Sequence, residues 1–92
     1  MEKLYRETKT NLMQINDLLG KLDRAFDYGE IDAIKSEIST KLVTTTNSFD
    51  QLDLYVVKEP ATKRYDAKMR VDQLKYDLTH FKAAFNTIVN KK

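Results

Sequence analysis

The sequence from Lys58 to Asp77, KEPATKRYDAKMRVDQLKYD, contains the end of one predicted helix and the start of the next. Pro60 has no backbone N–H and disfavours helical geometry at Glu59, so a helix arriving from the N-terminal side should end near Lys58. Proline also suits the first turn of a new helix. Beyond it, apolar residues recur at steps of four and three: Ala67, Val71, Leu74, Leu78, Phe81, Phe85 and Ile88. This spacing predicts one long amphipathic helix over about residues 62–90.

Two earlier segments show the same periodicity. The first has its stripe at Leu4, Thr8, Leu12, Ile15, Leu19, Leu22 and Phe26, widened by Leu18 and Ala25. It predicts a helix over about residues 3–27, which Gly29 would end by adopting a left-handed conformation. The second continues from Ile31 through Ile34, Ile38, Leu42, Thr45, Phe49, Leu52 and Val56. It predicts a helix over about residues 31–58.

Two positions leave alternatives open. The run VTTT at residues 43–46 is β-branched and resembles a short strand, but helical periodicity on both sides favours a continuous helix. Gly20 lies beside the first apolar stripe and costs a helix about 1 kcal/mol relative to alanine. Either this loss is tolerated, which is the interpretation we favour, or another helix approaches closely at Gly20.

Length and composition fit one small helical domain. The chain has 92 residues, of which 33% are charged, with two glycines, one proline and no cysteine or tryptophan. Three one-stripe helices joined by short links pack most simply as an antiparallel up-down-up three-helix bundle. We therefore predict an all-α fold with a single domain over residues 1–92, held without disulfides.

Composition also argues against several function classes. His80 is the only histidine, no cysteine is present, and no nucleophile, base and orienting group share a recognisable register, so an enzyme is not expected. The acidic residues match no calcium loop, and the two glycines form no phosphate-binding loop, so neither a metal nor another cofactor is predicted. The net charge of +2 is too small to favour nucleic acid. No apolar run is long enough for a signal peptide or a membrane span, which predicts a soluble chain.

The last predicted helix carries a second, outward stripe. Tyr65, Met69, Tyr76 and His80 lie about two residues from core positions and should therefore face away from the core. A basic ridge of Arg64, Lys68, Lys75 and Lys82 runs beside them. Exposed aromatic residues flanked by cations suit an acidic partner helix or an anionic membrane surface. The alternative is that single exposed tyrosines are ordinary and the ridge only keeps the bundle in solution.

Part of this helix also resembles a known family. Lys58-Glu59-Pro60, then Lys63-Arg64, then RVDQLKYD at residues 70–77 resemble the last helix of the N-terminal domain of membrin, or Bos, an early-Golgi SNARE. The first half is similar mainly in its helical layout and over residues 11–22. The resemblance implies a Habc-type regulatory domain of a Qb-SNARE, whose SNARE motif and membrane anchor would lie outside this chain.

The resemblance also implies a cellular role. A membrin-like protein would act in vesicle fusion between endoplasmic reticulum and Golgi, on the cytosolic face, with an early-Golgi syntaxin and Sec- and Bet-type SNAREs as partners. The domain would either fold back on its own SNARE motif or stay open and recruit a tether or coat factor. The alternative is a stand-alone helical adaptor unrelated to SNAREs, which the periodicity alone allows equally well.

Overall fold

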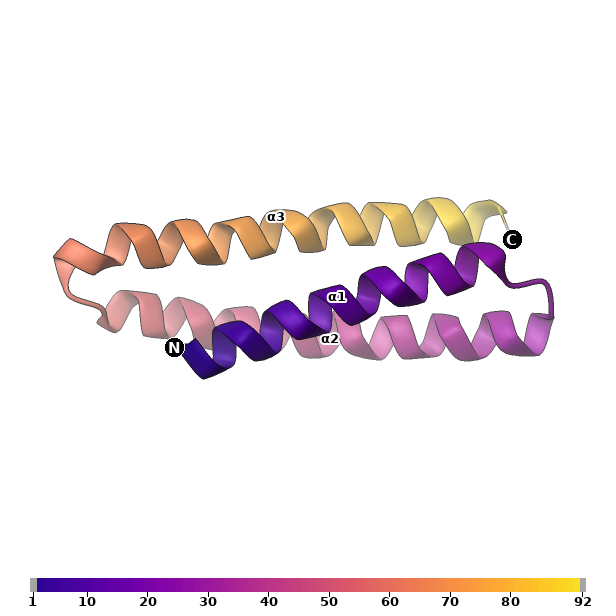
Figure 1. The fold of residues 1–92 in the computed structure, drawn as a ribbon, viewed down its shortest axis with the longest axis horizontal. Helices are drawn as coiled ribbons and strands as arrows, with labels where there is room; N and C mark the ends of the chain where they lie inside the picture. The colour runs from indigo at the N-terminus through magenta and orange to yellow at the C-terminus, as the bar shows by residue number, and fades with distance from the viewer. Residues whose placement is uncertain (1, 92) are drawn as a thin grey trace.

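The computed structural model describes residues 2–91, which form three α-helices: α1 (Glu2–Arg24), α2 (Tyr28–Lys58) and α3 (Ala61–Lys91). Figure 1 shows α2 running antiparallel to both α1 and α3, so that α1 and α3 are parallel. Each helix packs against the other two, and the bundle is a rod of 51 × 18 × 15 Å. The predicted all-α, up-down-up three-helix bundle is confirmed.

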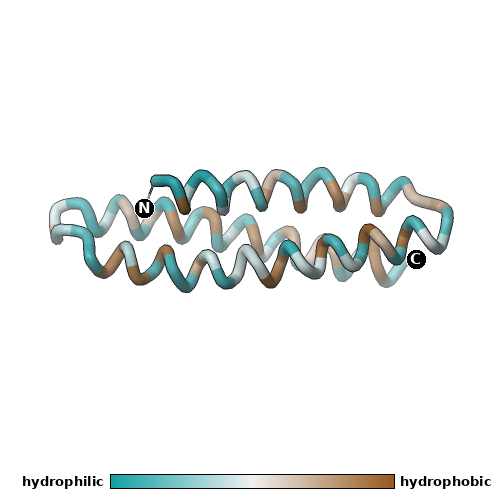
Figure 2. Tube along the Cα trace, turned by 90° about the horizontal axis from the view of Figure 1, so that it is seen from below, coloured by the Kyte–Doolittle hydropathy of each residue, from teal (hydrophilic) through white to brown (hydrophobic). Residues whose placement is uncertain are grey.

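The core forms where the three apolar stripes meet. Figure 2 shows hydrophobic residues recurring along every helix between hydrophilic ones. The residues that are almost completely enclosed include Ile15 and Leu22 from α1, Ile38 and Leu52 from α2, and Val71 from α3. Burying each large aliphatic side chain contributes about 1.5–3 kcal/mol, so these positions dominate the stability of the domain. The aromatic and aliphatic residues of the C-terminal half of α3, Phe81, Phe85 and Ile88, are only partly buried.

The turn between α1 and α2 differs from the prediction. α1 ends at Arg24, and the Ala25 N–H donates to the carbonyl of Leu22 at 3.3 Å. Residues beyond Arg24 leave helical geometry, so Phe26 does not continue the stripe and is 93% exposed. α2 begins at Tyr28, which places Gly29 inside its first turn, and no described residue has a positive φ. The prediction that a left-handed Gly29 ends the first helix is therefore wrong.

The two positions with open alternatives are now resolved. α2 continues without interruption through residues 43–46, and Thr45 lies fully buried on its core face. At Gly20, an added Cβ would meet only the Arg24 guanidinium, at 3.6 and 3.9 Å. No second helix approaches Gly20 within that distance, so the favoured interpretation of a tolerated loss holds.

The link between α2 and α3 follows the prediction. α2 ends at Lys58, and Glu59 adopts an extended conformation with φ −69° and ψ 148° before Pro60. The Pro60 carbonyl accepts hydrogen bonds from the N–H groups of Lys63 and Arg64, each at 2.9 Å, and so starts α3. Because α1 has 23 residues and its neighbours have 31, α1 stops short of this link (Figure 1).

Candidate protein-interaction surface

The outward stripe of α3 lies where the periodicity placed it. Tyr65, Met69 and Tyr76 are 71%, 52% and 61% exposed. His80 is also exposed, and its ring packs edge-on against that of Tyr76 with the centroids 4.4 Å apart. The stripe faces solvent because the opposite face of α3 is held in the core by Ala67, Val71, Leu74 and Leu78. Aromatic and thioether side chains are common anchors in protein interfaces.

The basic ridge beside this stripe is partly used inside the bundle. The guanidinium of Arg64 donates to the carbonyls of Val57 and Glu59, at 3.3 and 3.2 Å, and so satisfies the C-terminal end of α2. Lys75 pairs with Asp53 of α2 at 2.9 Å. Lys68 and Lys82 are exposed and make no ion pair among the described residues. The charge left for a partner is therefore smaller than the sequence suggested.

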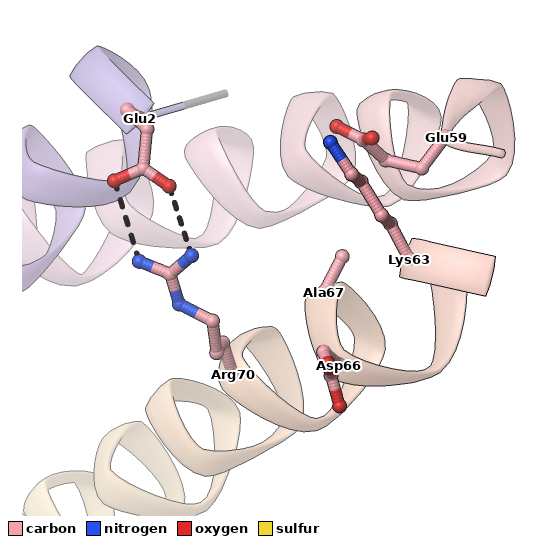
Figure 3. Close-up of a pocket in the computed structure, with 6 residues that line it drawn as sticks. All are labelled: Glu2, Glu59, Lys63, Asp66, Ala67 and Arg70. Atoms are coloured by element: carbon pink, nitrogen blue, oxygen red, sulfur yellow. Dashed lines mark hydrogen bonds and ion pairs between the residues drawn. The ribbon is translucent and has the colours of Figure 1, made fainter.

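A clamp between α1 and α3 lies near the α2–α3 link (Figure 3). Arg70 donates to both carboxylate oxygens of Glu2, at 2.8 and 3.3 Å, and its guanidinium lies 4.4 Å from the centre of the Tyr5 ring. The hydrogen bond from Arg70, together with its positive charge, holds the pKa of Glu2 below its ordinary value of 4.5. The same contacts raise the pKa of Arg70. The clamp fixes the N-terminal turn of α1 on α3.

The pocket beside this clamp shows no feature that selects a ligand. It is lined by Glu2, Glu59, Lys63, Asp66, Ala67 and Arg70. Lys63 and Glu59 point toward one another in Figure 3, and Arg70 is already paired with Glu2. Positive and negative groups therefore largely balance within the pocket. Among residues 2–91, no three His, Cys, Asp or Glu side chains lie close enough together to hold a metal ion.

A groove runs between α1 and α3 toward the C-terminal end of α3. Its lining is mostly apolar and combines Leu19, Gly20, Phe81, Ala84 and Ile88 with the polar Asn16, Asp23 and His80. Gly20 and Ala84 are the smallest of its lining residues. Sequence periodicity assigned Leu19, Phe81 and Ile88 to the core and Gly20 to its flank, and it did not indicate a groove. His80, which was placed on the outward stripe, also lines this groove.

The α1–α2 turn is a second surface that the periodicity missed. Besides Phe26, Tyr28 is 78% exposed at the start of α2. Exposed carboxylates flank the pair at Asp23, Asp27, Glu30 and Asp32. The sequence Asp27-Tyr28-Gly29-Glu30 did contain a signal for this helix start. Asp27 suits the N-cap position of a helix that begins at Tyr28, and Glu30 suits its first turn.

Comparison with known proteins gives consistent matches. The model of the BOS1/GOSR2/MEM11 N-terminal domain matches residues 1–92. The mouse protein "Golgi SNAP receptor complex member 2" is 33% identical over 92 residues, which are 100% of this chain and 43% of the mouse protein. The Drosophila melanogaster protein "Probable Golgi SNAP receptor complex member 2" is 32% identical over 87 residues, 95% of this chain and 40% of its own length.

A third relative agrees with these two. The Caenorhabditis elegans protein "Golgi SNAP receptor complex member 2 homolog memb-1" is 31% identical over 88 residues, 96% of this chain and 41% of the relative. The chain thus spans less than half the length of these relatives. No solved structure matches the chain significantly. Within residues 2–91, no helix combines the length and the hydropathy needed to cross a membrane. The family model and the relatives together show that this chain belongs to the BOS1/GOSR2/MEM11 family, whose N-terminal domain it matches from end to end.

Proposed function

We propose that this chain is the non-catalytic regulatory domain of a Golgi SNARE that acts in vesicle transport between endoplasmic reticulum and Golgi. The names of the relatives support the Golgi SNARE assignment and disfavour an unrelated adaptor. The full-length protein would work on the cytosolic face of these membranes with an early-Golgi syntaxin and Sec- and Bet-type SNAREs. The domain itself would contribute protein–protein contacts.

The outward stripe of α3 is the proposed recruiting surface for a tether or coat factor. The observation that carries this proposal is that Tyr65, Met69 and Tyr76 lie exposed on one face, while the opposite face of α3 packs in the core. None of these three side chains is needed to close the bundle. The exposed Lys68 beside them favours a partner with an acidic edge.

Paired substitutions test this surface. Met69→Ala combined with Tyr76→Ala should weaken binding to purified tether or coat subunits of this transport step by about tenfold or more. The matched control is Met13→Ala combined with Val43→Ala, because both residues are more than 60% exposed on other helices. Unchanged affinity of the α3 variant for every subunit that binds the original chain, with the helical circular dichroism intact, would reject the stripe.

Closure onto the SNARE motif is a second candidate, favoured by the groove between α1 and α3. Its apolar lining, which includes Leu19 of α1 and Ile88 of α3, is suited to the apolar face of an amphipathic helix. An NMR titration of the labelled chain with the SNARE-motif segment of the full-length protein separates the two candidates. Shifts along Gly20 and Ala84 would establish a closed, autoinhibited domain. No shifts at high excess would leave an open domain and support recruitment.

A further inference from the structure

The α1–α2 turn forms one end of the rod, which we call the aromatic tip: Phe26, Tyr28 and the flanking Asp23, Asp27, Glu30 and Asp32. We propose that this tip inserts Phe26 into an apolar pocket of a protein partner, and that lysine and arginine side chains rim that pocket. The tip lies at the other end of the bundle from the α2–α3 link, and its proposed role does not depend on the α3 stripe or on closure (Figure 1).

The first argument is the exposure of two neighbouring aromatic residues. Phe26 is 93% exposed and Tyr28 is 78% exposed, whereas Ala25 between them and the helix is buried. Burying a phenylalanine side chain contributes about 1.5–3 kcal/mol, and most of the Phe26 surface is left for another molecule to cover. Both residues are large and rigid and lie two positions apart at one end of the rod, and exposed aromatic residues are common anchors in protein interfaces.

The second argument is that the charges of the tip are not used inside the fold. Both ion pairs within residues 2–91 involve α3, as Arg70 with Glu2 and Lys75 with Asp53, and neither includes a carboxylate of the tip. Asp27 occupies the N-cap position of α2, yet its side chain makes no capping hydrogen bond. Lys21 and Arg24 line the hollow beside Phe26 together with Asp27 and Glu30. Residues 21–32 contain four acidic and two basic residues, so their net charge is 2 − 4 = −2.

Charge decides which kind of partner fits the tip. An anionic membrane would repel four carboxylates placed around the aromatic pair, so a lipid surface is disfavoured. A protein pocket with an apolar floor and a basic rim satisfies both components at once. Burial of Phe26 would supply most of the affinity, and the carboxylates would mainly increase the association rate and its dependence on salt.

Site-directed crosslinking tests the proposal on the full chain. A photoreactive phenylalanine analogue replaces Phe26, and a matched control carries the same analogue at Met13, which is 62% exposed in the middle of α1. We expect a discrete protein adduct from position 26 that is absent from position 13. The captured protein is then purified, and its crosslinked peptide should contain apolar residues next to lysine or arginine. Equal adducts from both positions, or none from position 26, would overturn the proposal.

Affinity measurements with the purified partner complete the test. Phe26→Ala should weaken binding by about tenfold or more while the melting temperature stays unchanged, because the side chain is exposed. Asp27→Asn with Glu30→Gln should weaken binding by a smaller factor and flatten its salt dependence, and asparagine suits the N-cap as well as aspartate does. Affinity that is insensitive to these changes would reject the tip. The proposal would also be rejected if the chain sedimented with 7:3 phosphatidylcholine–phosphatidylserine vesicles and Phe26→Ala abolished that sedimentation.

Discussion

Each end of this rod contains a short link between two helices, but the two ends use their charged side chains differently. At the α2–α3 link, Arg64 satisfies the carbonyls at the end of α2, and nearby Arg70 fixes Glu2 of α1. At the α1–α2 turn, no carboxylate pairs with a cation within residues 2–91, and most of the Phe26 surface is exposed. At the α2–α3 link, charged side chains hold the three helices together. At the α1–α2 turn, the carboxylates make no ion pair within residues 2–91, which is why we place the further binding site there.

The largest expected effect tests whether the core is equally closed toward both ends. Leu22 lies toward the α1–α2 turn and Leu52 toward the α2–α3 link, and both are fully buried. Replacing either with alanine should lower the free energy of unfolding by about 2–5 kcal/mol, because lost contacts and a cavity add together. Urea denaturation followed by circular dichroism measures this loss. A cost below about 1 kcal/mol at one site alone would show that this end is loosely packed.

A smaller change in the free energy of unfolding, this time an increase, is expected at Thr45, which lies between the two ends. Its hydroxyl is buried without a hydrogen-bond partner, whereas the buried Thr8 hydroxyl donates to the Leu4 carbonyl at 2.8 Å. Thr45→Val removes an unsatisfied polar group at almost constant volume and should stabilise the domain by about 1 kcal/mol. Thr8→Val, the matched control, should gain less because it also loses a hydrogen bond. Equal changes in melting temperature for the two variants would contradict this account.

The next prediction concerns the helix start at the α1–α2 turn. Gly29 lies in the first turn of α2 without a positive φ, and an added Cβ would lie 3.5 Å from a carboxylate oxygen of Asp27. Gly29→Ala should therefore stabilise the domain by about 0.5–1 kcal/mol, since alanine loses less backbone entropy on folding. Thermal unfolding measures the gain. A clear loss of stability would instead indicate a left-handed Gly29 and a different path for this turn.

The smallest effect is expected at the clamp near the other end. Arg70→Gln should raise the pKa of Glu2 toward 4.5, which NMR titration of the carboxyl carbon can measure. Because the folded pKa is depressed, the clamp stabilises the fold above pH 4.5, and this contribution is lost as the pH falls through the folded pKa. Acidification should therefore destabilise the original chain slightly more than the variant. Arg64→Gln should leave the Glu2 titration unchanged, which controls for general loss of positive charge.

Most of the fold was predictable from hydrophobic periodicity, but helix ends were not. Phe26 falls in phase with Leu22 and Leu19 and would be buried if α1 continued, yet the helix ends at Arg24. Periodicity fixes which face a residue occupies only while the helix lasts. Pro60 supplied the missing information at the α2–α3 link, where the bounds were predicted closely. The α1–α2 turn has no proline, and its glycine was assigned to the wrong role.

The candidate surface on α3 was predictable in part for a related reason. Exposure of Tyr65, Met69 and Tyr76 follows from positions on a single helix. The contact between Lys75 and Asp53 depends on the register between two helices, which a single-helix pattern does not contain. The clamp between Arg70 and Glu2 is even harder to predict from the sequence, because its two residues are 68 positions apart. The basic ridge was therefore predicted to face solvent, although two of its members, Arg64 and Lys75, bind groups at the C-terminal end of α2 and at Asp53.

The length of the rod has a consequence for how its two ends influence one another. Its long axis of 51 Å is several times the screening distance of about 8 Å at physiological ionic strength. The electrostatic interaction between charges at the α1–α2 turn and charges at the α2–α3 link is therefore screened almost completely. Substitutions at opposite ends should act independently, so that their free-energy changes add. Such insulation would allow one end to change its charge without disturbing what the other end holds together.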